Sequence, residues 1–160
     1  MPLLTRRNFV IATGALAVLP PSLASAGSHN VEMLNKHPTD PKGRMVFHPR
    51  VITVNAGDSV TFVPSDKSHN SLSIKGMVPE GGETWKGKIN QEVTVTLTKA
   101  GYYGYLCQPH QAMGMVGLII VEGEGNNANL ESAKAIKHRG RSQKVFDEIW
   151  AQAETEGLLA

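Results

Sequence analysis

Hydrophobic and polar residues alternate in short runs over much of the first three quarters of the chain. In the run 92–98 (EVTVTLT), valine and leucine occupy one face and threonine the other, which is the two-residue period of a half-buried strand. The run 50–64 contains two β-branched segments separated by Asn-Ala-Gly-Asp, a cluster typical of a turn. Further short runs of this kind occur at 31–35, 44–49, 70–76, 102–107 and 115–122.

Seven or eight such strands predict an all-β fold, namely a Greek-key antiparallel β-sandwich whose strands extend to about residue 122. Tyr103 lies at the entry to one strand, where it can form a tyrosine corner by bonding to the backbone a few residues upstream.

The pattern changes to a helical period after residue 122. Residues 129–139 predict a short helix with Asn129 as its N-cap. A second helix, with Ser142 as its N-cap, has an apolar stripe that we expect to pack on the sandwich. The stripe consists of Val145, Phe146, Ile149 and Trp150. The sequence therefore predicts a tail of two short C-terminal helices within residues 128–158.

The N-terminus is typical of a removable signal peptide, residues 1–26. It has a basic start, an apolar middle too short to cross a bilayer, and a small-x-small end. The pair Arg6 and Arg7 resembles a twin-arginine export signal, and a chance pair in an ordinary signal peptide is the alternative. We therefore expect export to a bacterial periplasm, no membrane span, and a single mature domain of residues 27–160.

The basic excess of the chain lies in this predicted signal peptide. The whole chain has 16 Lys and Arg against 14 Asp and Glu, and Arg6 and Arg7 account for the difference. A nucleic-acid-binding domain requires a basic excess that the mature chain lacks. We therefore expect no nucleic-acid partner, and we expect a monomer.

Cys107 is the single cysteine of the chain. An unpaired thiol in an oxidising compartment is a liability unless it is buried or occupied. A buried apolar thiol, a catalytic nucleophile and a metal ligand are the three explanations. His110 could act as the base of a thiol enzyme, but neither an oxyanion-hole glycine turn nor a helix start follows Cys107. We expect a protein that is not an enzyme.

The side chains that follow Cys107 favour a metal site. A thiolate, an imidazole and a thioether suit copper, and two histidines, one cysteine and a distant methionine form the blue-copper arrangement. His69, which opens a predicted strand beside a turn, is the best candidate for the second histidine. Structural zinc would want more thiolates and would leave the methionines unexplained. We expect the remaining histidines to be solvated or structural: His29, His37, His48 and His138.

Four segments of the sequence occur together in one known family. They are DKSHN (66–70), IKGMVPEG (74–81), KGKIN (86–90) and CQPHQAMGM (107–115). They closely resemble the pseudoazurins, small periplasmic copper proteins of the cupredoxin fold. The resemblance extends from about residue 31 to the C-terminus and includes the two helices, which plastocyanins and amicyanins lack.

The resemblance implies one copper ion per chain, cycling between Cu(I) and Cu(II). It implies His69, Cys107 and His110 as equatorial ligands and Met115 as the axial ligand. Met113 is the alternative axial ligand, because Cys-x₂-His-x₂-Met is the amicyanin spacing.

The resemblance also implies roles for residues around these ligands. Asn70 would tie the two ligand segments together, and Met45 would pack against the exposed ligand histidine. Pro109 would stiffen the loop, and Met113 would lie in the apolar surface of the site. The implied function is the transfer of single electrons between redox partners by transient contact. The alternative is a periplasmic copper-binding module for delivery or storage, with exposed and exchangeable ligands.

Family partners include copper nitrite reductases, nitrous oxide reductase, cytochrome c peroxidases and c-type cytochromes. We expect contact through the His110 edge and a small apolar patch, which consists of Met45, Pro109, Ala112 and Met113. A basic rim could steer acidic partners, with ordinary solubilising lysines as the alternative. The rim consists of Lys36, Lys67, Lys75, Lys86 and Lys88. Leu106 and Gln111 replace a lysine and an aromatic residue usual in pseudoazurins, which changes the expected partner surface.

Overall fold

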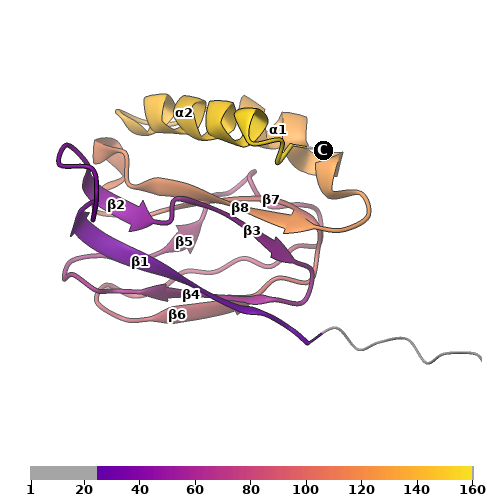
Figure 1. Cartoon of the computed structure of the whole chain (residues 1–160), viewed down its shortest axis with the longest axis horizontal. Helices are drawn as coiled ribbons and strands as arrows, with labels where there is room; N and C mark the ends of the chain where they lie inside the picture. Colours follow the sequence, from indigo (N-terminus) through magenta and orange to yellow (C-terminus); the bar gives the residue numbers. More distant parts are fainter. Residues whose placement is uncertain (1–24, 160) are drawn as a thin grey trace, which may run out of the picture.

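Two four-stranded sheets face each other in the computed structural model, which describes residues 25–159 (Figure 1). The first sheet has the order β2 (Arg44–His48), β1 (Ser28–Lys36), β4 (Ser59–Val63) and β6 (Val93–Thr96). The second has the order β3 (Val51–Asn55), β8 (Val116–Glu122), β7 (Gly101–Leu106) and β5 (Leu72–Ser73). The predicted signal peptide, up to residue 24, lies outside the described residues.

The predicted β-sandwich is confirmed, and the alternating run 92–98 contains β6. Each sheet also contains one parallel pair, β1 with β4 and β3 with β8, beside its antiparallel pairs. Alternation along a strand shows which face is buried but not the direction of the neighbouring strand, because the side-chain period is two in both cases. The parallel pairs were therefore not predicted.

Aromatic side chains fill the space between the sheets. Phe47 and Phe62 each lie edge-on to Tyr105, with ring centroids 4.8 and 4.9 Å away, and Phe62 stacks on Trp85. Cys107 and Met115 belong to this same core. The predicted tyrosine corner is confirmed, because the Tyr103 hydroxyl donates to the Lys99 carbonyl oxygen at 2.8 Å.

Helices α1 (Leu130–Ala135) and α2 (Ser142–Thr155) cover the outer face of the β3-β8-β7-β5 sheet (Figure 1). A single turn, η2 (Asn126–Asn129), leads into α1. The apolar stripe packs as predicted, with Phe146 and Ile149 fully buried against residues of β7 and β8. No helix among residues 25–159 is long and apolar enough to cross a bilayer.

The two predicted helix caps do not form capping hydrogen bonds. Asn129 stands at the start of α1, but its side chain binds the backbone N–H and C=O of Tyr102 at 3.0 and 2.8 Å. Ser142 is the first residue of α2, and its hydroxyl donates to the Gln111 carbonyl oxygen. In both cases a partner far along the chain competes with the helix for the polar side chain.

The carboxylate of Asp58 holds the beginning of β1. It accepts hydrogen bonds from the backbone N–H of Gly27 at 2.6 Å and of Asn55 at 2.9 Å, and its other contact is His29 Nε2 at 2.9 Å. The bond to His29, followed by those to the two backbone N–H groups, lowers the pKa of Asp58 to about 2. His29 therefore has a structural role, as expected.

Candidate metal centre

Three potential ligand atoms converge at one end of the sandwich. The Nδ1 atoms of His69 and His110 are 3.1 Å apart, and Cys107 Sγ lies 3.7 Å from the first and 3.5 Å from the second. Donors that share one metal ion lie within about 4 Å of each other, since each metal–ligand bond is about 2.0–2.3 Å long. The three side chains therefore fit a single metal ion, and this soft sulfur–imidazole set suits copper.

The β7–β8 connection brings Cys107 and His110 together. Cys107 directly follows β7, and His110 precedes the single turn η1 (Gln111–Met113). The loop closes through two backbone hydrogen bonds, from Cys107 N–H to the Met115 carbonyl at 3.0 Å and from Met115 N–H to the His110 carbonyl at 3.2 Å. The loop can therefore present several side chains in one small space.

His69 is oriented by Asn35, a residue that the sequence analysis did not identify. Its Nε2 lies 3.0 Å from the side-chain oxygen of Asn35 on β1. An N–H at Nε2 that donates to this oxygen leaves Nδ1 as the unprotonated nitrogen facing Cys107 and His110. The backbone N–H of Asn35 in turn donates to the Asp66 carboxylate at 2.7 Å. No local spacing could have identified Asn35, because it lies on β1, 34 positions before the loop that carries His69.

Left-handed backbone flanks His69. Ser68 and Asn90 have φ angles of 77° and 61°. The Asn90 side-chain oxygen accepts from the Ser68 N–H, and the Asn90 N–H donates to the His69 carbonyl at 2.8 Å. Non-glycine residues in this region carry backbone strain, which persists where surrounding contacts determine the conformation. These two residues thus fix the backbone that carries His69.

Asn70 joins the two segments that supply the donors, as the resemblance implied. Its side-chain oxygen accepts from the Gln108 N–H at 2.9 Å, and its amide donates to the Gly87 carbonyl at 3.2 Å. Asn70 is buried beside His69, and Gln108 follows Cys107. The Asn70 side chain therefore holds the segment that carries His69 next to the segment that carries Cys107.

Burial favours the neutral forms of Cys107 and His69 in the metal-free protein. Burial raises the pKa of the Cys107 thiol, and burial followed by the nearby His110 lowers the pKa of His69. A metal ion must therefore displace the thiol proton when it binds.

The two candidate methionines differ in exposure. Met115 is fully buried in the same core cluster as Cys107, whereas Met113 has 47% of its surface exposed. Met45 is half-buried against this core, and Pro109 and Ala112 are exposed. The exposed members of the predicted apolar patch thus lie in the loop that carries His110.

The two departures from the pseudoazurin pattern have different surroundings. Leu106 is buried in the cluster between the second sheet and the helices, so it is part of that packing. Gln111 begins η1 and is half-buried.

The predicted rim lysines are all exposed, and none forms a salt bridge within residues 25–159. The four histidines expected to be solvated or structural lie outside the donor cluster. His37 accepts backbone hydrogen bonds from Thr39 and Asp40 and lies edge-on to His48, while His138 stacks on Phe146.

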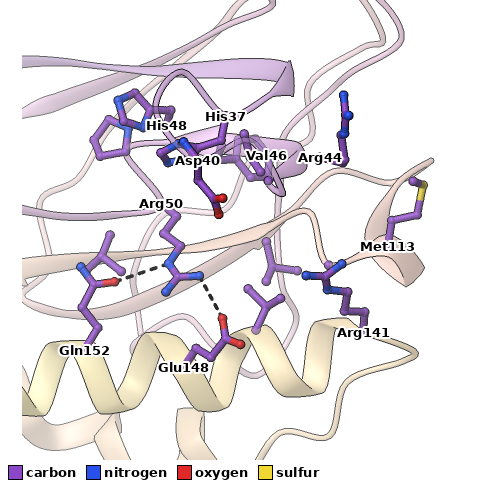
Figure 2. Close-up of a pocket in the computed structure, with 17 residues that line it drawn as sticks. His37, Asp40, Arg44, Val46, His48, Arg50, Met113, Arg141, Glu148 and Gln152 are labelled. Atoms are coloured by element: carbon purple, nitrogen blue, oxygen red, sulfur yellow. Dashed lines mark hydrogen bonds and ion pairs between the residues drawn. The ribbon is translucent and has the colours of Figure 1, made fainter.

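A hollow of about 500 Å³ lies elsewhere, between the β2–β3 region and α2 (Figure 2). Arg50 crosses it and binds Glu148 at 3.3 Å and Gln152 at 3.4 Å, which ties the sheet to α2. Met113 and Arg141 lie near each other at one end of the hollow (Figure 2). None of the three converging donors lines it, so this hollow is separate from the candidate metal centre.

Comparison with known proteins gives consistent relatives. Residues 31–122 match the family described as copper binding proteins, plastocyanin/azurin family. The chain is 40% identical to a pseudoazurin of Methylorubrum extorquens over 149 residues, covering 93% of this chain and 97% of the relative. It is 43% identical to a pseudoazurin of Paracoccus pantotrophus over 141 residues, covering 88% of this chain and 92% of the relative.

Solved structures agree with these relatives. A pseudoazurin structure from Sinorhizobium meliloti superposes with a TM-score of 0.74 at 51% identity, covering 80% of this chain and 97% of the other. One from Methylobacterium extorquens superposes with a TM-score of 0.71 at 43% identity, covering 78% and 98%.

Proposed function

The chain belongs to the pseudoazurins, type 1 copper electron-transfer proteins of the plastocyanin/azurin family, and we propose that His69, Cys107 and His110 hold its copper ion. The convergence of two imidazole nitrogens and one sulfur within 3.7 Å carries this assignment. When bound, copper supplies the one-electron exchange between Cu(I) and Cu(II). The chain itself supplies the donors and holds them still.

Met115 is the axial ligand of this proposal, and Met113 is part of the protein surface. The burial of Met115 beside Cys107 and the exposure of Met113 support this choice. The backbone bonds of Met115 to both Cys107 and His110 keep it within the same loop closure. A long, weak thioether contact is the usual fourth ligand of such sites.

The surroundings of the donors support a carrier over a copper delivery or storage module. His69 and Cys107 are fully buried, and Asn35 and Asn70 hold their segments by hydrogen bonds. A delivery site requires exposed donors that exchange their metal readily. A carrier requires donors that barely move when the metal changes charge, and a buried, bonded donor set has that property.

Electrons enter and leave through the edge of His110 in this proposal. His110 is the partly exposed donor of the three, and Pro109, Ala112 and Met113 are exposed beside it. A small apolar surface of this kind suits the brief contacts of redox encounters. Met45, the fourth member of the predicted patch, is half-buried against the core cluster that contains Cys107 and Met115.

The partners are redox proteins, for which we propose copper nitrite reductase, nitrous oxide reductase, cytochrome c peroxidase or c-type cytochromes. The unpaired rim lysines give acidic surfaces a route of approach. Leu106, which stands where pseudoazurins usually carry a lysine, is buried and offers no charge to a partner. Partner choice therefore depends more on the remaining lysines and on Gln111.

The site of action in this proposal is the periplasm. Removal of residues 1–26 as a twin-arginine-like signal gives a mature domain of residues 27–160. The signal pattern of the sequence and the family of the chain support this location.

The ligand assignment is tested by adding Cu(II) to the processed protein and recording its visible absorption spectrum and its voltammogram. We expect an intense thiolate–copper band and a reversible one-electron wave. Cys107→Ser should abolish the band, Met113→Ala should leave it unchanged, and Met115→Ala should alter both band and potential. A colourless copper complex, or a band that Cys107→Ser retains, would contradict the proposal.

A further inference from the structure

We propose that the N-terminal turn of α2 holds the copper-binding loop in its working position, with Ser142 as a positioning residue. This inference rests on the proposed ligand set and adds to it a part of the fold that donates no ligand. It assigns the helical tail a role in setting the properties of the metal centre.

Two consecutive carbonyl groups of η1 are bound by the start of α2. The Ser142 hydroxyl donates to the Gln111 carbonyl oxygen, and the Arg141 backbone N–H donates to the Ala112 carbonyl oxygen at 3.0 Å. Ser142 is fully buried, so this contact is shielded from water. A buried hydrogen bond of this kind is costly to lose, because the Gln111 carbonyl would keep only its contact with the Gly114 N–H and no water would replace the hydroxyl.

The position of η1 fixes the donors on either side of it. The Gln111 carbonyl also accepts from the Gly114 N–H at 2.9 Å, and the His110 carbonyl accepts from Met113 and Met115 N–H groups at 3.0 and 3.2 Å. These bonds connect the turn directly to the backbone of His110 and Met115. A displacement of η1 therefore moves two of the four proposed ligands together.

Two glycines allow the loop and the helix to approach this closely. A Cβ atom on Gly140, whose φ is +57°, would lie 2.7 Å from the Ala112 carbonyl oxygen. A Cβ atom on Gly114, whose φ is +93°, would lie 2.8 Å from a Val145 methyl group. In Figure 2 the loop at Met113 and the turn at Arg141 lie next to each other. Gly140 thus packs against the backbone of Ala112 and Gly114 against the Val145 side chain, and a side chain added at either glycine would disturb the contact.

The helix can serve as a fixed support because the sheet holds it firmly. Phe146 and Ile149 are fully buried against β7 and β8, the two strands that the copper loop connects. Arg50 adds a polar link to Glu148 and Gln152. The loop is therefore held by β7 and β8 at its two ends and by the start of α2 at η1.

Ser142→Ala tests the proposal, with Ser132→Ala as the matched control. Ser132 also donates from its hydroxyl to a backbone carbonyl, that of Asn129 at 3.0 Å, but it is an exposed residue of α1 away from the loop. In the metal-free protein, Ser142→Ala should speed amide hydrogen exchange at Gly114 and Met115. In the copper-loaded protein, it should shift the reduction potential and the thiolate–copper band and release copper to a chelator about tenfold faster.

Gly140→Ala provides a second test that does not depend on the hydroxyl. Its control is Gly157→Ala, which carries the same left-handed strain at φ +67° but meets no atom within 4 Å. Both variants should lose stability from backbone strain, and Gly140→Ala should lose more because of its contact with the Ala112 carbonyl. Gly140→Ala alone should change the potential and the band, because its new methyl group pushes against the Ala112 carbonyl.

The possible results separate this inference from the proposed function. If wild-type protein shows no blue-copper spectrum, the ligand assignment fails. If wild type shows the spectrum but Ser142→Ala and Gly140→Ala match their controls in potential, band and copper release, α2 is only a packing element and the inference is overturned. If Ser142→Ala does not fold, the Gly140 and Gly157 pair decides in the same way.

Discussion

His69 illustrates how single residues outside the ligand set determine the centre. Its ring is held by Asn35 and its backbone by Asn90, and neither residue is a candidate ligand. Asn70 has the corresponding role for the Cys107 segment. At the residue scale, hydrogen bonds from three asparagines hold the candidate ligands and their backbone in place.

Asn70→Ala should lower the free energy of unfolding of the metal-free protein by about 2–3 kcal/mol. The variant leaves the Gln108 N–H and the buried Gly87 carbonyl without their partner. Urea unfolding of the metal-free protein measures this loss, with the exposed Asn127→Ala as a control expected to change little. Equal stability of the two variants would show that the Asn70 bridge contributes nothing to the fold.

The residues predicted from sequence and those missed differ in how far away their partners lie. Cys107 and His110 stand three residues apart in one loop, so their spacing and donor chemistry were visible in the sequence. Asn35 acts on a residue 34 positions away, and Ser142 on one 31 positions away. Such pairs depend on which strands and helices become neighbours, and no local pattern contains that information.

At the scale of elements, periodicity predicted where strands and helices occur, but not which strands pair or in which direction. β6 and the stripe of α2 follow directly from alternation and helical spacing. The parallel pairing of β1 with β4 does not, because it depends on the crossover of the chain between the sheets. The same crossover puts Asp58, beside β4, against the first residues of β1.

Asp58 makes the attachment of β1 dependent on pH. Its folded-state pKa of about 2 lies below the ordinary value of 3.8, so its contribution to stability is complete well above 3.8 and is lost as the pH falls through 2. Asp58→Asn should therefore be less stable than wild type at neutral pH. The difference between the two should shrink as the pH is lowered towards 2.

Urea unfolding of wild type and Asp58→Asn across this pH range measures the effect. Asp147→Asn, which changes an exposed carboxylate on α2, is the control. A stability difference that stays constant from neutral pH to pH 2 would contradict the role assigned to the charge of Asp58.

At the scale of the whole molecule, the balance of charge excludes general attraction to acidic partners. If residues 1–26 are removed as we propose, acidic and basic residues are equal in number, so steering must come from a local group of lysines. Lys67 and Lys86 lie in the two segments next to His69 and Asn90, and both are exposed. Any effect of these charges must weaken as salt is added.

Lys67→Glu and Lys86→Glu together should slow electron transfer with an acidic redox protein roughly tenfold at low salt, because they remove steering. The difference from wild type should disappear at high ionic strength. Stopped-flow measurement over a range of salt concentrations tests this, with Lys144→Glu on α2 as a control of lower effect. A double variant with wild-type rates at low salt would rule out the basic rim.

The bond between Gly27 and Asp58 has a consequence for how the protein matures. In the unprocessed chain the Gly27 nitrogen is an amide that lies 2.6 Å from the carboxylate. Cleavage after Ala26 would turn that nitrogen into a positively charged terminus at the same place, so an ordinary hydrogen bond would become an ion pair. Signal-peptide cleavage would then strengthen the attachment of the N-terminal strand. Recombinant protein with extra residues before Gly27 would keep the ordinary hydrogen bond and lack the ion pair.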